Sequence, residues 1–484
     1  MRTVFIPQNL DLDRLTQEVP PPFNYYVDNF KYIVSLITEI PVYNKSVLNT
    51  MNFVPINAQK LKSEIHNYLR YLEYLIKNDV IESDNHYIKD KKSKGYRFTQ
   101  QYRTEVKPGL IHKRTLLKKL NKKSRQDPKT KRKYHYLTKW FDSGLQIDFP
   151  ATQEYLLEEL NTNQSIGIEN ALLKFNSRYL SAYWLNEKNF FYVVDSNVGR
   201  FHSILTCLKS ELRNFITYRG QSLVSVDIVN SQPCLSVALL DPNFYSITSN
   251  HTDQSNLFNI HNISTSSTNK HNHFLSPSSL YNITSYIMLS KSHYTSKSQP
   301  FMQYKTLVSN GRLYEYIEEK YWQNTGIKVP SRKDLKSIVF TVLFTDNRFY
   351  GQKEAAPKRI FRSIFPQVYE VFSQIKKKDS TALPRLLQTI ESKLMLDLVA
   401  KRIATERPNM PIFTIHDSIV CPDGNEIYVA EVIKEEMEKA IGVTPCLKFE
   451  YWKPENLKNS INASGKIPAF NESSSTADTD NENQ

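Results

Sequence analysis

The chain has 484 residues, of which 40% are hydrophobic and 12% aromatic, a composition typical of a globular protein large enough for more than one domain. Its formal net charge is +14, and its 12 glycines are too few for a glycine-rich phosphate-binding fold. The four cysteines lie far apart without zinc-type spacing, so neither a disulfide framework nor structural zinc is expected. No apolar run has the length of a signal peptide or a membrane span, and we expect a cytoplasmic (intracellular), soluble monomer without membrane partners.

Positive charge is concentrated between Lys89 and Lys139. This segment has 19 Lys or Arg residues against three acidic ones, a net charge of about +16. Such a concentration is typical of a surface that binds nucleic acid, and a solvated basic linker is the alternative. Six aromatic residues lie among the cations, where they are suited to stack on bases: Tyr96, Phe98, Tyr102, Tyr134, Tyr136 and Trp140.

The region before residue 140 is expected to form one basic nucleic-acid-binding domain. Residues 1–55 are Pro-rich and are expected to be irregular. Leucines and isoleucines at helical spacing predict a helix over 57–80, and short β-prone runs with a basic loop follow it. A helix followed by short strands and a basic loop is typical of a winged-helix arrangement, with any other small α+β domain as the alternative.

Further along the chain, 150–185 is predicted to be helical and 246–300 changes composition. The second stretch is rich in Asn, Ser, Thr and His, which favours an insertion loop. Metal binding by its histidines is the less favoured alternative: His251, His261, His271 and His273. Residues 455–484 are expected to form a disordered acidic tail.

Two β-prone runs that are far apart in the chain each carry an aspartate. Residues 412–420 predict a tight hairpin with His416 and Asp417 at its tip, and residues 223–228 predict a strand that ends near Asp227. Two carboxylates at neighbouring strand ends of one sheet can hold two Mg²⁺ ions, with Mn²⁺ as an alternative. Either run alone would be interpreted as a core strand.

Residues 331–351 are predicted to form a helix with one cationic and aromatic face. Ser331 is suited to be its N-cap. Four side chains follow at successive i+4 steps: Arg332, Lys336, Phe340 and Phe344. Two cations one turn apart suit a triphosphate, and an aromatic ring one turn later suits a base or a sugar. Taken alone, the pattern also fits an ordinary amphipathic helix.

The spacing Arg-x-x-x-Lys-x-x-x-Phe at 332–340 resembles the fingers helix of family A DNA polymerases and of single-subunit phage-type RNA polymerases. Segments similar to the other motifs of this family occur in the family order: 198–203 (VGRFHS), 212–215 (LRNF), 223–232 (LVSVDIVNSQ, motif A), 386–392 (LLQTIES) and 415–418 (IHDS, motif C). Each segment is short, and the resemblance rests on the ordered set across 198–453, roughly half of the chain.

The resemblance implies DNA synthesis from a DNA primer–template and nucleoside triphosphates. Asp227 and Asp417, with the backbone carbonyl of Ile228, would hold two Mg²⁺ ions. Lys336 would be the general acid, and the nucleotide would be bound by Arg332, Lys336, Phe340, Phe344 and Gln232. The duplex would be contacted by Arg200, Arg213, Gln388 and His416.

Several features depart from the family pattern. Gln232 stands where family A DNA polymerases carry Glu and phage-type RNA polymerases carry Gly. Its bulk suits a steric gate, which favours deoxynucleotides. Pro233 follows it, and Phe344 stands where Tyr-Gly is common. The chain from Lys336 to Asp417 is short, so reduced fingers are expected, and no upstream acidic motifs suggest a proofreading exonuclease.

The expected fold is α+β, with a right-hand polymerase palm, a reduced fingers helix and a helical thumb, joined to the N-terminal domain. The expected divisions are 1–140 (basic domain), 141–222 (thumb-like), 223–330 (first half of the palm, with the insertion 246–300), 331–360 (fingers helix), 361–454 (second half of the palm) and 455–484 (tail). The expected function is DNA synthesis without proofreading, for replication of a mobile element, plasmid or phage. The alternatives are an RNA-synthesising or primase-like polymerase, a non-catalytic DNA-binding replication protein with a degenerate palm, and a nuclease.

Overall fold

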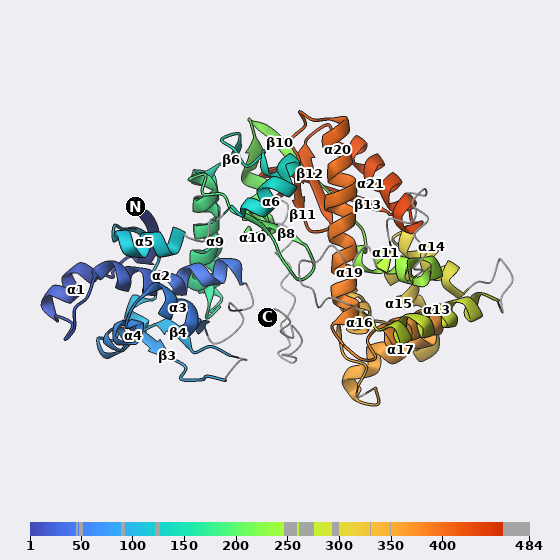
Figure 1. The fold of residues 1–484 in the computed structure, drawn as a ribbon, viewed down its shortest axis with the longest axis horizontal. Coiled ribbons are helices and arrows are strands. Elements are labelled where there is room, and N and C mark those ends of the chain that lie inside the picture. The colour runs from blue at the N-terminus through green and yellow to red at the C-terminus, as the bar shows by residue number, and fades with distance from the viewer. Residues whose placement is uncertain are drawn as a thin grey trace.

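The computed structural model describes residues 1–44, 47, 52–88, 92–121, 126–245, 259–260, 275–292, 300–329, 331–348 and 350–457. The histidines predicted as alternative metal ligands and the tail from residue 458 lie outside these residues. The described residues form a mixed α+β structure, which confirms the α+β part of the expected fold. They make two bodies, each with its own core (Figure 1).

The smaller body is built by residues 2–121 around a long buried helix, α2. Its elements are β1 (Arg2–Pro7), α1 (Leu12–Glu18), α2 (Val27–Tyr43), β2 (Val54–Pro55), α3 (Ala58–Glu64), α4 (Tyr68–Lys77), β3 (Ile81–Ser83), β4 (Gly95–Phe98), η2 (Gln100–Tyr102), β5 (Val106–Ile111) and α5 (Arg114–Asn121). The expectation that residues 1–55 are irregular is wrong, because most of their prolines stand at or between the ends of β1, α1 and α2.

Two small sheets hold the smaller body together. β1 pairs antiparallel with β5, and β2, β4 and β3 form a second antiparallel sheet in that order. The single helix predicted over 57–80 is two helices, because Asn67 adopts a left-handed backbone conformation (φ 55°) between α3 and α4. The order of elements is therefore helix, strand, two helices and a β-hairpin.

The basic segment is divided between the two bodies. Its first part, up to residue 121, belongs to the smaller body, whereas α6 (Pro128–Lys133) and α7 (His135–Thr138) join the core of the larger body. Tyr96, Tyr134 and Trp140 are at most 8% exposed. The expectation that they stack on bases is wrong, because the rings face the two cores while the neighbouring cations face the solvent.

An antiparallel sheet with the order β11-β12-β10-β9-β6 is the centre of the larger body, and β13 pairs with β10 as well. The strands are β6 (Leu145–Ile147), β9 (Ile216–Tyr218), β10 (Gln221–Ile228), β11 (Phe413–Ile415), β12 (Ser418–Pro422) and β13 (Leu447–Trp452), and a separate hairpin joins β7 (Tyr192–Val194) to β8 (Phe201–Ser203). β10 lies between β12 and β13, and this central position buries its residues 223–226.

Helices cover the sheet and form a separate layer beside it. They are α8 (Phe149–Ser165), α9 (Ala171–Asn186), α10 (Ile204–Cys207), η3 (Ser210–Phe215), α11 (Ser231–Leu235), η4 (Ser236–Leu240), η5 (Pro242–Tyr245), α13 (Pro277–Ser292), α14 (Pro300–Ser309), α15 (Leu313–Thr325), α16 (Arg332–Phe344), η7 (Lys353–Ala355), α17 (Ala356–Ile364), α18 (Pro366–Ile375), α19 (Ala382–Ser392), the π-helical η8 (Lys393–Ala400), α20 (Lys401–Glu406) and α21 (Glu426–Ile441). α19, η8 and α20 follow one another as one long helical segment that packs on β11 and β12, and α21 packs on β10 and β12 (Figure 1).

The two bodies meet through α2 and α9. The ring of Phe5 packs edge-to-face on that of Tyr183, with centroids 4.9 Å apart, and Tyr43 packs on Trp184. Within the described part of the chain, no helix combines the length and the apolarity needed to cross a bilayer.

Candidate active site

The central sheet of the larger body brings the two predicted aspartates together. Asp227, near the end of β10, lies directly opposite Ser418 in the β10–β12 ladder, and Ser418 follows Asp417 in sequence. The β11–β12 hairpin closes at the pair Ile415–Ser418, which leaves His416 and Asp417 as a two-residue turn. His416 adopts φ 55°, a conformation that costs energy for a residue with a side chain and that is common at functional sites.

Both carboxyl groups are held in surroundings that disfavour their charge. Burial raises the pKa of Asp227 to about 6, and the charges of Asp417 and Glu450 add to this effect. Burial also raises the pKa of Asp417, against the opposing influence of the nearby Ser231 and Arg200. A cation bound between these two carboxyl groups would stabilise their ionised form and lower their pKa values.

These carboxylates fit a magnesium site that is completed by substrate. Oδ2 of Asp227 is buried and has no hydrogen-bond partner among the described residues. The described part of the chain holds no cluster of three or more His, Cys, Asp or Glu side chains arranged around a metal. Mg²⁺ in phosphate-transferring sites is commonly bound by one or two carboxylates and by substrate oxygens, so the pair is a suitable donor set. Ile228 ends β10 opposite Leu447, and a ligand role for its carbonyl stays a prediction.

Glu450 is a neighbouring carboxylate that the sequence analysis missed. It lies on β13 opposite Ser225, so it shares a face of the sheet with Asp227. Arg213, on η3, is close to both acidic groups: burial lowers its pKa, and Glu450 and Asp227 oppose this shift. Its charge is directed at the carboxylates, whereas a contact with a duplex stays a prediction. The alternation of side chains along the strand-forming residues 447–452 could have indicated from the sequence that Glu450 lies on one face of the sheet.

A second carboxylate that the sequence analysis missed, Glu391, links two predicted residues. Nη2 of Arg200 donates to Oε2 of Glu391 at 2.9 Å, and Nε2 of Gln232 donates to the same oxygen. Glu391 is 2% exposed. Burial raises its pKa to about 7, an effect that Arg200 opposes and Asp417 reinforces. The available signal was a Glu on the otherwise apolar face of α19, since buried carboxylates are rare unless they are paired.

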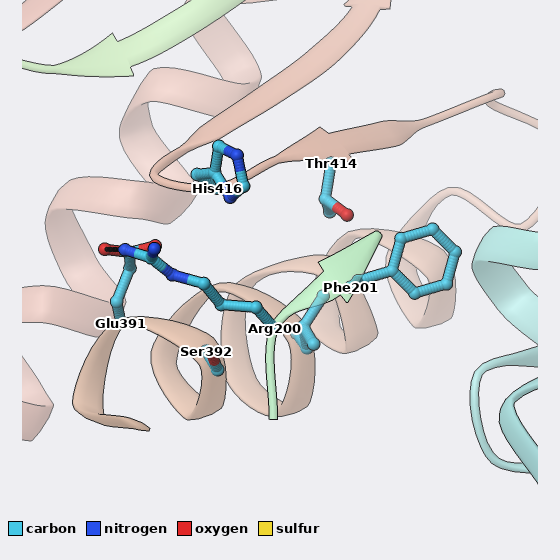
Figure 2. A pocket seen from close by; sticks show the side chains of 7 residues that line it. Arg200, Phe201, Glu391, Ser392, Thr414 and His416 are labelled. Carbon is cyan, nitrogen blue, oxygen red and sulfur yellow. Dashed lines mark hydrogen bonds and ion pairs between the residues drawn. The ribbon is translucent and has the colours of Figure 1, made fainter. Parts of the chain in front are cut away.

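Arg200 is positioned by the loop between β7 and β8. Asp195 accepts hydrogen bonds from the backbone N–H groups of Asn197, Val198 and Arg200 at 2.8–2.9 Å. Gly199 adopts φ 75°, which the loop requires and which glycine tolerates. Figure 2 shows the Arg200 side chain reaching along α19 to Glu391, below His416 at the hairpin turn. The small pocket there is lined by Arg200, Phe201, Glu391, Ser392, Leu396, Thr414 and His416.

Buried polar atoms without hydrogen-bond partners are concentrated around this pocket. Among the described residues they include Nε of Arg200, Oε1 of Gln232 and Oε1 of Glu391, besides Oδ2 of Asp227. Most buried polar atoms in folded proteins are hydrogen-bonded, so a group of exceptions in one place indicates a site that a polar ligand completes. Gln388 lies one turn before Glu391 on the same helix and is half-buried.

Helix α16 presents the predicted cationic and aromatic stripe. Ser331 caps its N-terminus, and Leu335, Val339 and Val342 bury the opposite face. Arg332 and Lys336 are exposed. The predicted start and polarity of this helix are therefore confirmed, whereas its predicted end is wrong, because the helix ends at Phe344 with Thr345 as its C-cap.

The stripe carries one ion pair and one ring pair. Arg332 is 3.4 Å from Glu315 on α15, and Lys336 has no ion-pair partner among the described residues. The rings of Phe340 and Phe344 stack, with centroids 5.3 Å apart. α16 packs against α19, the helix that carries Glu391.

Comparisons with known proteins leave the family of the chain open. No protein-family model matches the sequence, and no curated protein matches it. Among solved structures, the chain is similar to the polymerase domain of Pol1 from M. smegmatis, in complex with DNA primer–template and dNTP, with 10% sequence identity. That similarity covers 70% of this chain and 73% of the other at a TM-score of 0.38. At this score the overlap carries no argument, and we base the functional proposal on the site itself.

Proposed function

We propose that the protein is a template-dependent nucleotidyltransferase, a family A-like DNA polymerase that extends a primer with nucleoside triphosphates and lacks proofreading. The observation that carries the proposal is the convergence of Asp227 and Asp417 on one sheet, with raised pKa values and an unpartnered buried oxygen. Mg²⁺ bound by this pair would make the primer hydroxyl a better nucleophile and would stabilise the charge of the departing pyrophosphate.

The residues around the carboxylates suit the primer end. Arg200 is fixed by Glu391 on one side and by the Asp195 loop on the other. A guanidinium held in this way can donate to a base or a sugar without losing further side-chain freedom. Gln232 is fixed by the same Glu391, which leaves its Oε1 as an acceptor beside the site. That fixed position is what a gate for the sugar needs.

The stripe on α16 suits the incoming nucleotide. Arg332 and Glu315 are both largely exposed, and an exposed ion pair contributes only ~0–1 kcal/mol, so a triphosphate can replace Glu315 at little cost. Lys336 is available to bind the phosphates and to donate a proton to the leaving pyrophosphate. Phe340, 44% exposed, offers a ring face for the base.

Primer extension with the purified chain, a recessed primer–template, Mg²⁺ and dNTPs tests the proposal. Asp227→Asn and Asp417→Asn are each expected to lower the rate at least ~100-fold, because either change removes one of the two metal-binding carboxylates. The control is Asp423→Asn, which removes a carboxylate that is ion-paired with Lys453 at the far end of β12. It should leave extension near the wild-type rate.

Three outcomes would contradict the proposal in different ways. Extension that survives both substitutions would remove the carboxylate pair from the reaction. A strong preference for NTPs over dNTPs would favour the RNA-synthesising alternative. DNA degradation with Mg²⁺ but without nucleotides would favour the nuclease alternative. Parallel reactions with Mn²⁺ test the choice of metal.

A further inference from the structure

The smaller body contains a helix–turn–helix unit followed by a β-hairpin. α3 and α4 are joined by three residues, the last of which is the left-handed Asn67. The β3–β4 hairpin follows α4 directly, and β2, which precedes α3, pairs with β4. In helix–turn–helix proteins the second helix enters the major groove of DNA and the first crosses the backbone. α4 is the helix in the second position.

The inner face of α4 is firmly anchored, so its outer face has a fixed position. Tyr71 accepts a hydrogen bond from Asn29 on α2 at 2.9 Å, and the hydroxyl of Tyr74 donates to the carbonyl of Val19 at 2.6 Å. Leu72 and Leu75 are also buried. The helix is held against α2 by apolar contacts and by hydrogen bonds, as a surface that reads bases must be.

The outer face of α4 has the side chains that read base edges. Leu69 is 55% exposed and Ile76 is 43% exposed, and Arg70, Glu73 and Lys77 are exposed as well. Arg and Lys pair with guanine, Glu accepts from cytosine, and apolar side chains contact the thymine methyl group. Leu69 and Ile76 are two turns apart, so they lie on the same face of the helix as Glu73.

Exposed cations also lie in the elements that precede and follow α4 in the chain. Lys60 and Lys62 are exposed on α3, and Lys92 and Lys94 precede β4 in the hairpin. Lys92 is 3.5 Å from Asp84, an ion pair that a phosphate can replace. Figure 1 shows α3, α4 and β3 in the part of the molecule that lies away from the β10–β13 sheet.

We propose that α4 enters the major groove of double-stranded DNA and reads its sequence, while α3 and the β3–β4 hairpin contact the phosphates on either side. A helix about 10–12 Å in diameter fits the ~12 Å major groove of B-DNA. The deep, narrow major groove of an RNA duplex does not admit it. This surface would bind DNA whether or not the larger body transfers nucleotides.

Fluorescence anisotropy with the full chain and a dumbbell DNA duplex, whose ends are closed by loops, tests the proposal. A closed duplex has no primer terminus, so binding at the candidate active site contributes little. Arg70→Ala/Lys77→Ala is expected to weaken binding at least ~10-fold and to reduce the salt dependence of the affinity. The control, Arg14→Ala/Lys107→Ala, removes the same charge from α1 and β5 and should bind nearly as the wild type does.

Two further variants separate this proposal from the proposed function and from a general charge effect. Asp227→Asn should keep full affinity for the dumbbell, even where primer extension is lost. Leu69→Asn should weaken binding without any change of charge. Selection from a pool of dumbbells with a random central sequence should enrich one motif with the wild type and lose that motif with Arg70→Ala/Lys77→Ala.

Three results would overturn the proposal. One is an affinity of Arg70→Ala/Lys77→Ala equal to that of the control variant. Another is binding of a closed RNA duplex as tight as that of DNA. A pool that stays random after selection would overturn the reading of bases by α4.

Discussion

Replacement of Asp227 by asparagine should stabilise the metal-free protein while it removes the candidate activity. Burial and the charge of Asp417 raise the pKa of Asp227 from 3.8 to about 6. Each pKa unit corresponds to 1.36 kcal/mol, so the ionised carboxylate destabilises the folded state by ~3 kcal/mol. Asparagine has nearly the same shape and no charge, and it removes this term at any pH.

The sign of the pH dependence follows from the raised pKa. Between about pH 4 and pH 6 the folded chain binds more protons at Asp227 than the unfolded chain does, so the free energy of unfolding falls as the pH rises through this window. Asp227→Asn should therefore leave stability nearly unchanged at pH 4 and raise it by up to ~3 kcal/mol at pH 8. Urea unfolding in EDTA at the two pH values measures the difference.

Addition of Mg²⁺ should remove most of the difference in stability between the two proteins at pH 8. A ligand at 100 times its dissociation constant stabilises a folded protein by ~2.7 kcal/mol, and only the wild type should gain this stabilisation. Asp423→Asn should neither gain stability in EDTA at pH 8 nor lose the stabilisation that Mg²⁺ gives the wild type. If Asp227→Asn destabilises the protein in EDTA at pH 8, or if it still gains the wild-type stabilisation from Mg²⁺, the account of Asp227 as a strained metal ligand is refuted.

Three further changes test other parts of the molecule. Lys336→Ala should lower kcat/KM for nucleotide incorporation at least ~10-fold, and Lys333→Ala, equally exposed on α16, should not; equal effects would show that only total charge matters. Gln232→Ala should lower the preference for dNTPs over NTPs by at least ~10-fold in steady-state kinetics, and an unchanged ratio would place the gate elsewhere. Lys376 donates to the carbonyls of Val342 and Thr345 at the end of α16, and burial lowers its pKa to about 7. Lys376 should therefore contribute a rise in wild-type stability of up to ~3 kcal/mol between pH 7 and pH 9, and urea unfolding should show a rise smaller by that amount in Lys376→Met.

The sequence was most informative where a local pattern and a side-chain property coincide. The proximity of Asp227 and Asp417 could be predicted from the sequence. Asp227 lies near the end of one short β-prone run and Asp417 interrupts another, and antiparallel pairing of the two strands brings these positions together. α16 could be predicted from its cap and its period, since both are set by neighbours within one or two turns.

The predictions failed where the outcome depends on which side of an element faces the core. Tyr134 and Trp140 lie among lysines in the chain, yet they are buried, because adjacency in sequence does not fix the direction of a side chain. Glu391 was missed because its partners, Arg200 and Gln232, come from distant segments. No local pattern contains that information.

The larger body has arginines beside the candidate metal site and a second pair of cations, Arg332 and Lys336, on α16. The charged side chains around the pocket and the carboxylate pair include Asp227, Asp417, Glu391, Glu450, Arg200 and Arg213. Among these six side chains the acidic groups outnumber the arginines, and Lys448, directly opposite Asp227 on β13, is exposed to solvent. If the cations of α16 formed ion pairs with these carboxylates, they would neutralise the pair without metal and lower its pKa values. Instead, Arg332 pairs with Glu315 at the surface and Lys336 faces the solvent, so both remain available for an anionic ligand that arrives with its own charge.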